Sequence, residues 1–445
     1  MTTQRQQPNR ACTPRQPIAC VFAALLLFAS AAPGSAQALS QRGFGDLRMT
    51  LFPQETPTDR VHAIADAVVR EEVFAKPAVW LQFAAGVDLR QNTHDQVEQR
   101  VDFRDRRALR PAASVRRLAA TLARGPLTVD VGKQFIRWGK ADIVTPTDRF
   151  APRDFLNVID TELIGVTGAR AVFQRAAHTL DAVWTLFTPS RIPLLGQRWA
   201  VPHTVPGTVP GTVPHTVPGT VPQTVCGTVS ETVCDTEAVI PNGSQVGIRY
   251  GHVASRGEYS VMIFNGFNHL PNIEAVPDVQ PGRFQLLRRY PAMRAYGADA
   301  AVPTRFFTVK GEAAYSTSDT PGTDDYVLYV VQLERLTGEW QLAAGYAGEV
   351  VTARRAAATF APDRGLTRAI VARAAYTIDS NRSLAVEGVA RQNGRGVYTR
   401  VEYSHARGQH WRGTLTGAVI AGRRDDFLGQ YNRNSHVAAG IRYSF

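Results

Sequence analysis

The 445-residue chain has no long apolar stretch after its N-terminal segment. No later run reaches the roughly 18 consecutive apolar residues that a membrane-spanning helix needs, which excludes a helical membrane protein. Cysteine is scarce as well: the chain has 4, and only Cys226 and Cys234 lie beyond the N-terminal segment. Two cysteines cannot supply the dense disulfide framework of a small secreted domain.

Catalytic and metal-binding motifs are also missing. The chain contains no G-x-S-x-G, H-E-x-x-H, G-x-x-x-x-G-K-[ST] or C-x-x-C motif, and its 10 histidines lack metal-ligand spacing. We therefore expect no cofactor, no metal and no enzyme; a barrel enzyme stays the less favoured alternative, because its catalytic groups would be spread over separate strands. The net charge of +12 does not predict nucleic-acid binding, because the arginines alternate along strand-like segments.

The N-terminal segment has the organisation of a secretory signal. Three arginines without an acidic residue precede an apolar and small-residue run over 18–32, and Ala36-Gln37-Ala38 has the A-x-A form of a cleavage site. We expect residues 1–38 to be removed. The mature chain then carries a net charge of 12 − 3 = +9.

The last stretch of the chain, 434–445, alternates between apolar and other residues. Its apolar face runs to the final residue and comprises Val437, Ala439, Ile441, Tyr443 and Phe445. Such period-2 alternation is typical of a β-strand with one apolar face. The stretch resembles the C-terminal signal strand of bacterial outer-membrane β-barrels, which ends in Phe and is read by the insertion machinery. The alternative is an edge strand of a soluble sandwich.

Sixteen strand-sized runs occupy the chain from Ala78 onward. They cover residues 78–89, 112–124, 126–138, 162–176, 178–188, 244–256, 258–268, 292–302, 304–316, 326–336, 339–351, 366–378, 382–394, 396–406, 410–422 and 434–445. Most have the 9–11 residues with which a tilted strand crosses a bilayer. Tight turns alternate with longer connections such as 90–111, 139–161 and 189–243, as short periplasmic turns and long outer loops do in outer-membrane barrels. We therefore predict an all-β, transmembrane antiparallel barrel of about 16 strands over residues 78–445.

Within these runs an apolar face opposes a charged face, so one face suits lipid and the other water. The charged side chains expected to line the pore are Lys310, Glu312, Arg373, Arg400, Glu402, Arg412 and Arg442. His436 also falls on this inner face and is expected to line the pore rather than catalyse a reaction. Basic residues outnumber acidic ones in the set, which predicts a preference for anions.

The segment 39–77 precedes the predicted barrel and is expected to be periplasmic. The stretch 41–52 is ambiguous in pattern, with a short strand as one interpretation. It is followed by apolar residues at helical spacing: Val61, Ile64, Ala65, Val68 and Val69. With Thr58 as an N-cap, this spacing predicts an amphipathic helix over 58–74. Two roles are open: a packing helix in the periplasm, or a hatch in the barrel mouth.

A tandem repeat of eight tetrapeptides, beginning TVPG, occupies residues 204–235. Proline at every fourth position of the first five blocks favours an extended, polyproline-like chain that buries no core. We expect a low-complexity stalk in an extracellular loop, either a functional surface segment or tolerated filler. Whether Cys226 and Cys234 pair is open.

The most distinctive stretch is VGKQFIRWGKAD at 131–142, which continues through a charged loop to Asp154. It resembles the G-[RK]-Q-x-x-x-W-G strand end and following P-x-D loop of a poorly characterised group of porin-like bacterial outer-membrane barrels, related in style to alginate-export-like porins. The matching residues are Gly132, Lys133, Gln134, Trp138, Gly139, Pro146 and Asp148, and FTPSRIP at 187–193 is a second shared element. The resemblance covers the barrel but not the repeat, and it implies a fold rather than a substrate.

The loop 139–161 carries nearly balanced charges. Ion pairs on an exposed loop contribute only about 0–1 kcal/mol each, whereas they matter more in a narrow lumen. We therefore predict that this loop folds inward, with Trp138 anchoring its base. The residues expected near the constriction are Asp142, Asp148, Arg149, Arg153 and Asp154. The alternative is a salt-bridged structural plug.

Together these patterns predict a porin-like channel for passive passage of small polar, anionic solutes, in the outer membrane of a bacterium with two membranes. The expected partners are outer-membrane lipid, the insertion machinery acting on the strand that ends at Phe445, and small-molecule solutes; an oligomer is open. The alternative is a gated transporter of hydrophobic or specific ligands, with the 58–74 helix as its hatch. The sequence does not identify the solute.

Overall fold

The computed structural model describes most of the chain after the N-terminal segment. The described residues are 39–56, 59–142, 144–193, 197–200, 236–277, 284–355, 362–392 and 394–445. The predicted signal peptide (1–38) and the repeat (204–235) with Cys226 and Cys234 lie outside these residues, as does the predicted N-cap Thr58.

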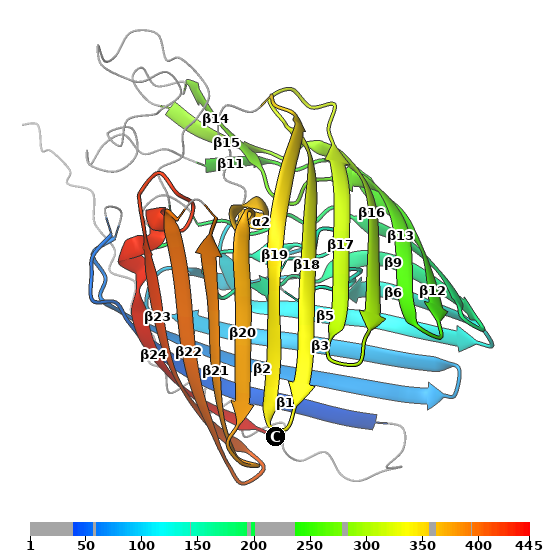
Figure 1. Cartoon of the computed structure of the whole chain (residues 1–445), viewed down its shortest axis with the longest axis horizontal. Coiled ribbons are helices and arrows are strands. Elements are labelled where there is room, and N and C mark those ends of the chain that lie inside the picture. The colour runs from blue at the N-terminus through cyan, green and yellow to red at the C-terminus, as the bar shows by residue number, and fades with distance from the viewer. Residues whose placement is uncertain are drawn as a thin grey trace, which may run out of the picture.

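The wall of the molecule is an all-β, closed antiparallel barrel of 18 strands (Figure 1). In chain order these strands are β1 (Leu39–Leu51), β2 (Ala63–Ala78), β3 (Leu81–Asn92), β5 (Arg110–Arg124), β6 (Leu127–Gln134), β9 (Val166–Arg175), β10 (His178–Leu186), β12 (Ser244–Ala254), β13 (Gly257–Phe267), β16 (Ala292–Pro303), β17 (Thr308–Thr317), β18 (Asp325–Thr337), β19 (Trp340–Ala353), β20 (Ala369–Thr377), β21 (Arg382–Arg391), β22 (Gly396–Arg407), β23 (Trp411–Gly422) and β24 (His436–Ser444). Each pairs with its neighbours in this order.

The C-terminal strand closes the barrel. β24 pairs antiparallel with β1, from Phe44 opposite Ser444 to Leu51 opposite Val437. Val437 and Ile441 are each 49% exposed on the outer face, whereas His436 and Ala438 are buried on the inner face. The alternation in the sequence thus separates the two faces, and closure leaves no unpaired edge in the wall.

All of the predicted strands coincide with wall strands, but the prediction is two strands short and places the barrel's start too late. The missing strands are β1 and β2, which pair with each other over their whole length. The predicted helix over 58–74 is therefore wrong, because its described part lies largely in β2. The segment 39–77 forms wall and cannot act as a hatch.

The error has a physical cause in the composition of β2. Ile64, Val68 and Phe74 face the interior together with charged residues, while alanines and valines face outward. Apolar residues on both faces obscure the period of two. Ile64 and Val68, four apart, then match the spacing of a helix.

The connections alternate in length, with short turns at one end of the barrel and long loops at the other (Figure 1). The long loops carry the small elements: β4 (Val97–Asp102), β7 (Arg153–Asp154), β8 (Glu162–Leu163), β11 (Thr236–Val239), β14 (Asn272–Pro277), β15 (Phe284–Arg289), α2 (Pro362–Gly365) and the 3-10 turn η2 (Gly429–Asn434). β11, β14 and β15 form a separate sheet above the long-loop end. No helix in the described ranges is long and apolar enough to span a membrane.

Candidate functional site

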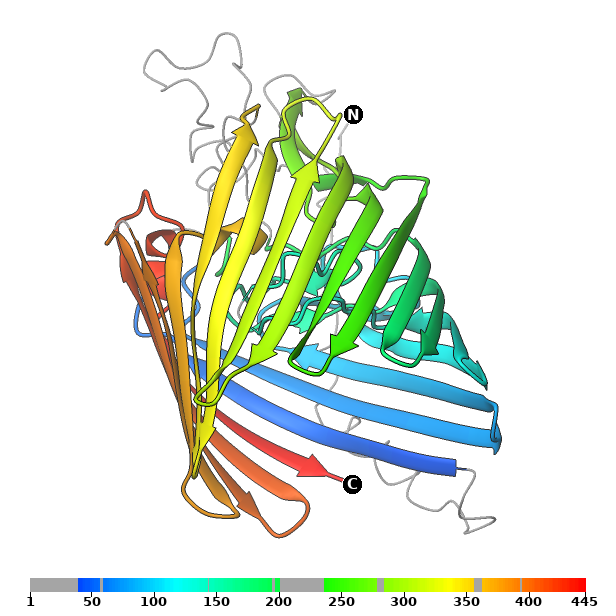
Figure 2. The same ribbon diagram turned by 45° about the vertical axis from the view of Figure 1, so that its right-hand side comes forward.

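The connection between β6 and β9, residues 135–165, folds into the barrel and is called the inward loop here. In Figure 2 its coil lies inside the ring of strands. Its residues contact strands that are far from β6 around the barrel, β17 and β18 on one side and β1 on another. The loop therefore crosses the interior rather than lying over the rim.

The base of the inward loop is anchored by aromatic packing. Trp138 is 2% exposed, and its ring meets Phe150 edge-on with 4.9 Å between ring centroids. Phe150 in turn packs on Phe264 of β13 at 5.0 Å. The Trp138 indole N–H donates to the Asp181 carboxylate of β10 at 2.9 Å, so the one polar atom of the ring is also satisfied.

Glu312 of β17 holds the middle of the inward loop. Its Oε2 accepts hydrogen bonds from the backbone N–H groups of Lys140 at 3.0 Å and Ala141 at 3.1 Å. Its Oε1 accepts from the Thr147 N–H at 2.7 Å and the Thr147 hydroxyl at 2.8 Å. Glu312 is 3% exposed, so a buried carboxylate is stabilised by hydrogen bonds from four converging donors of the loop.

Asp142 makes the next contact with the wall. Its carboxylate lies 3.2 Å from the Lys310 ammonium and accepts from the Gln332 amide at 2.9 Å. Lys310 also pairs with Glu334 at 2.6 Å. One lysine thus faces two carboxylates, one from the loop and one from β18.

The far part of the loop is fixed by buried ion pairs. Arg110 donates two hydrogen bonds to Asp154, at 2.8 and 3.0 Å, and Arg191 lies 3.3 Å from the same carboxylate. Although burial alone raises the pKa of Asp154, the charges of these arginines lower it to about 2. Asp160 pairs with Arg48 of β1. Asp154 was predicted near the constriction, but it lies in this buried cluster and does not border the open cavity described next.

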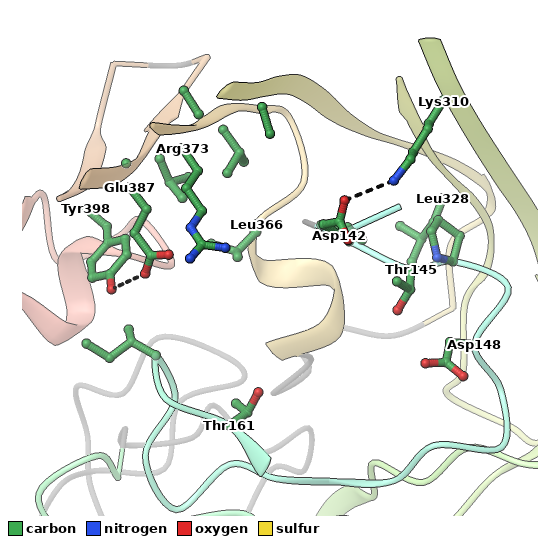
Figure 3. Close-up of a pocket in the computed structure, with 18 of the residues that line it drawn as sticks. Asp142, Thr145, Asp148, Thr161, Lys310, Leu328, Leu366, Arg373, Glu387 and Tyr398 are labelled. Atoms are coloured by element: carbon green, nitrogen blue, oxygen red, sulfur yellow. Dashed lines mark hydrogen bonds and ion pairs between the residues drawn. The ribbon is translucent and has the colours of Figure 1, made fainter. Parts of the chain in front are cut away.

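An open cavity of about 910 Å³ remains between the inward loop and the wall from β17 to β23. Figure 3 shows the loop residues Asp142, Thr145, Asp148 and Thr161 along its border. Lys310, Arg373, Glu387 and Tyr398 border it from the wall. Apolar side chains such as Leu328 and Leu366 lie between these polar groups, so the cavity presents charges on a partly apolar surface.

Of the remaining loop residues predicted near the constriction, Asp148, Arg149 and Arg153 all border this cavity. The Asp148 side chain is 2% exposed, accepts the Trp138 N–H at 3.3 Å and lies 3.5 Å from Arg137. Its burial raises the pKa of the carboxyl, an effect that nearby Arg153 and Arg137 only partly offset. Arg149 donates to the Pro146 carbonyl at 2.7 Å within the loop.

The predicted pore-lining charges are mostly paired. Arg400 donates to Glu402 at 2.6 Å, and Arg442 donates to Asp46 at 2.9 Å. Arg373 and Arg412 have no ion pair within the described part of the chain. Only Lys310 and Arg373 of the predicted set border the cavity, and two of the four predicted arginines, Arg400 and Arg442, pair with acids of the wall. His436, buried by Phe52 and Trp199, lies in the apolar interior instead of lining open space.

Sequence reasoning missed several residues of the site. Glu334, Glu387 and Tyr398 occupy inner-face positions of predicted strands, so strict alternation would have found them. The cluster of Arg70, Asp88, Arg90 and Glu162 was also missed, and its member Arg70 lies in β2, which was interpreted as a helix. No group of three or more His, Cys, Asp or Glu residues in the described ranges is placed to hold a metal ion.

Comparisons with known proteins agree with the barrel. No protein-family model matches the chain, and no curated protein sequence is similar to it. The crystal structure of Acinetobacter baumannii OccAB4 is similar with a TM-score of 0.52 at 9% identity, covering 93% of this chain and 100% of that one. A BenF-like porin from Pseudomonas fluorescens Pf-5 has a TM-score of 0.51 at 8% identity, covering 92% and 97%. Identities this low establish the fold alone, and the likeness to alginate-export-like porins stays a prediction.

Proposed function

We propose that the chain is an outer-membrane, porin-like channel for passive passage of small polar solutes, with a preference for anions. The observation that carries the proposal is the open cavity of about 910 Å³ beside the inward loop, inside a closed barrel. A barrel this wide leaves room for an aqueous passage, and a loop folded across it sets the width of that passage. The fold that the chain shares with the BenF-like porin supports the same function.

The outer surface supports a membrane setting. Ile263, Ile370 and Val419 on outward faces are 58–60% exposed. An apolar face of this kind is stable in lipid and costly in water. Aromatic pairs lie at the short-turn end, Trp340 with Tyr376 at 4.7 Å and Trp411 with Tyr443 at 4.8 Å between centroids, where an interfacial girdle belongs. Short turns would face the periplasm, and the β24 strand ending at Phe445 would be read by the insertion machinery.

Charge supports the anion preference. The cavity is bordered by six basic side chains, Arg149, Arg153, Arg305, Lys310, Arg335 and Arg373, and by four acidic ones, Asp142, Asp148, Glu334 and Glu387. Arg373 is a wall cation of this set with access to solute, since it is exposed and has no ion pair in the described part of the chain. An excess of positive charge in a narrow passage favours anions.

Reversal potentials across planar bilayers under a KCl gradient test this proposal. The parent protein should be anion-selective, and Arg373→Glu should shift the reversal potential toward cation selectivity. Arg412→Glu is the matched control, because Arg412 is a lumen-side arginine that has no ion pair among the described residues and does not border the cavity; it should shift the potential less. A cation-selective parent protein would contradict the anion preference.

A further inference from the structure

Two histidines lie side by side on the outer face of the barrel, near its short-turn end. His178 of β10 is directly opposite His252 of β12. The Val253 N–H donates to the Ala177 carbonyl at 2.9 Å, which makes the histidines a non-hydrogen-bonded cross-strand pair. Side chains approach most closely in pairs of this type.

Both histidines point away from the lumen. Leu180 follows His178 on the same face of β10 and is 47% exposed, and Ile248 shares the face of His252 on β12 and is 56% exposed. His178 is itself exposed and His252 is half-buried. Solvent at the short-turn rim can therefore reach the pair.

One nitrogen of each imidazole faces the other ring. The Nδ1 atoms of His178 and His252 lie 3.3 Å apart. Two imidazoles that bind one ion at about 2.0–2.1 Å in a tetrahedral arrangement have nitrogens about 3.3–3.4 Å apart. The Tyr250 hydroxyl lies 2.7 Å from the His178 Nδ1, so an oxygen atom is also adjacent to one of the two nitrogens.

Aromatic neighbours restrict both rings. His178 stacks on Tyr250 with 5.9 Å between centroids, and His252 lies 5.5 Å from Tyr259. The histidine rings are 4.6 Å apart. Rings held in this way lose little further freedom when they bind an ion, which favours binding.

We propose that His178 and His252 bind one divalent transition-metal ion, Zn²⁺ or Cu²⁺, at the rim of the barrel. Imidazole suits both ions, and Cu²⁺ binds a given nitrogen site more tightly than Zn²⁺. The bound ion would link β10 to β12, with water completing its coordination. The proposal is independent of the channel function.

Calorimetric titration of the full-length barrel in detergent with CuCl₂ and ZnCl₂ tests the site. One ion should bind per chain, and His178→Ala and His252→Ala should each weaken binding at least tenfold. His405→Ala is the matched control, because His405 also contacts a tyrosine ring, Tyr403 at 6.5 Å, but lies beside no second histidine in the described part of the chain; it should bind like the parent.

Electron paramagnetic resonance of the Cu²⁺ complex provides a second measurement. The spectrum should show coupling to two nitrogens in the parent protein and to one in either single variant. Absence of binding to the parent, or binding that neither His178→Ala nor His252→Ala weakens, would overturn the proposal. Heat-modified mobility in gels confirms that each variant is a folded barrel, since both positions lie on the outer face.

Discussion

Replacing Glu312 by alanine should detach the middle of the inward loop from the wall while leaving the barrel folded. The carboxylate accepts four hydrogen bonds, and all of them come from loop residues 140, 141 and 147. None comes from a wall strand. The side chain therefore joins the loop to β17 without contributing to the pairing of β17 with its neighbours.

The structure sets the size of the effect. Three of the four donors are backbone N–H groups, those of Lys140, Ala141 and Thr147. A buried donor without a partner costs about 1–3 kcal/mol, so the docked loop loses about 3 kcal/mol even at the lower limit. That loss shifts the ratio of docked to released loop by about a hundredfold. Glu312→Gln should have a smaller effect, because the glutamine amide keeps one oxygen that can still accept hydrogen bonds.

Single-channel recording in planar bilayers measures this release. Glu312→Ala should give a larger mean conductance and more current noise than the parent protein, because the loop no longer narrows the passage steadily. Glu402→Ala is the matched control: Glu402 is an inner-face glutamate that contacts Arg400 and Thr416 rather than the loop. Parent-like conductance and noise in Glu312→Ala would refute the interpretation that Glu312 holds the inward loop against the wall.

Three further outcomes follow from the loop's ion pairs and packing. Asp154→Asn should lower the free energy of unfolding by about 3–5 kcal/mol in urea titrations, because Arg110 and Arg191 stay buried without their full counter-charge. Asp148→Asn should be neutral or stabilising in the same assay, since it removes a charge whose burial raises the pKa of the carboxyl. Because the pKa of Asp154 is lowered to about 2, its contribution of about 2 kcal/mol is present above the unfolded-state pKa of about 3.8. That contribution should be lost as the pH falls from about 4 to 2, and a pH-independent difference between parent and Asp154→Asn over this range would contradict it.

The sequence predicted the wall of the barrel in strands where apolar and polar residues alternate regularly. In β10, Leu180 and Trp184 alternate with Asp181 and Thr185, and the structure places the first pair outward and the second inward. In β24 the same alternation extends to the closing contact with β1. Alternation predicts facing because successive side chains of a strand point to opposite sides.

The alternation does not predict facing where the inner face of a strand packs against other parts of the chain instead of facing water. β2 faces a plugged part of the lumen, so Ile64 packs with Phe52 and Trp199 in a buried cluster. Its inner face is therefore partly apolar, and the strand resembles a helix in sequence. The residue pattern of a strand cannot show that a loop distant in the sequence will cover its inner face.

Of the candidate site, only the inward fold of its loop was predictable from the sequence. The charges of 139–161 indicated a loop that folds inward, and the structure brings that loop onto β17. Which charges border the open passage could not be read from the sequence, because Asp148 and Asp154 differ only in their tertiary partners. Asp154 meets two arginines, one from β5 and one from the loop after β10, whereas Asp148 borders the cavity.

Liposome swelling most directly tests the claim that a closed barrel with an open cavity conducts solutes. Purified protein reconstituted into liposomes should permit swelling in small sugars and amino acids, at rates that decline steeply as the solute grows. Glu312→Ala should extend permeation to larger solutes, because the loop that narrows the passage is released. Protein that is folded and inserted, yet gives no swelling with any solute in either form, would contradict the account.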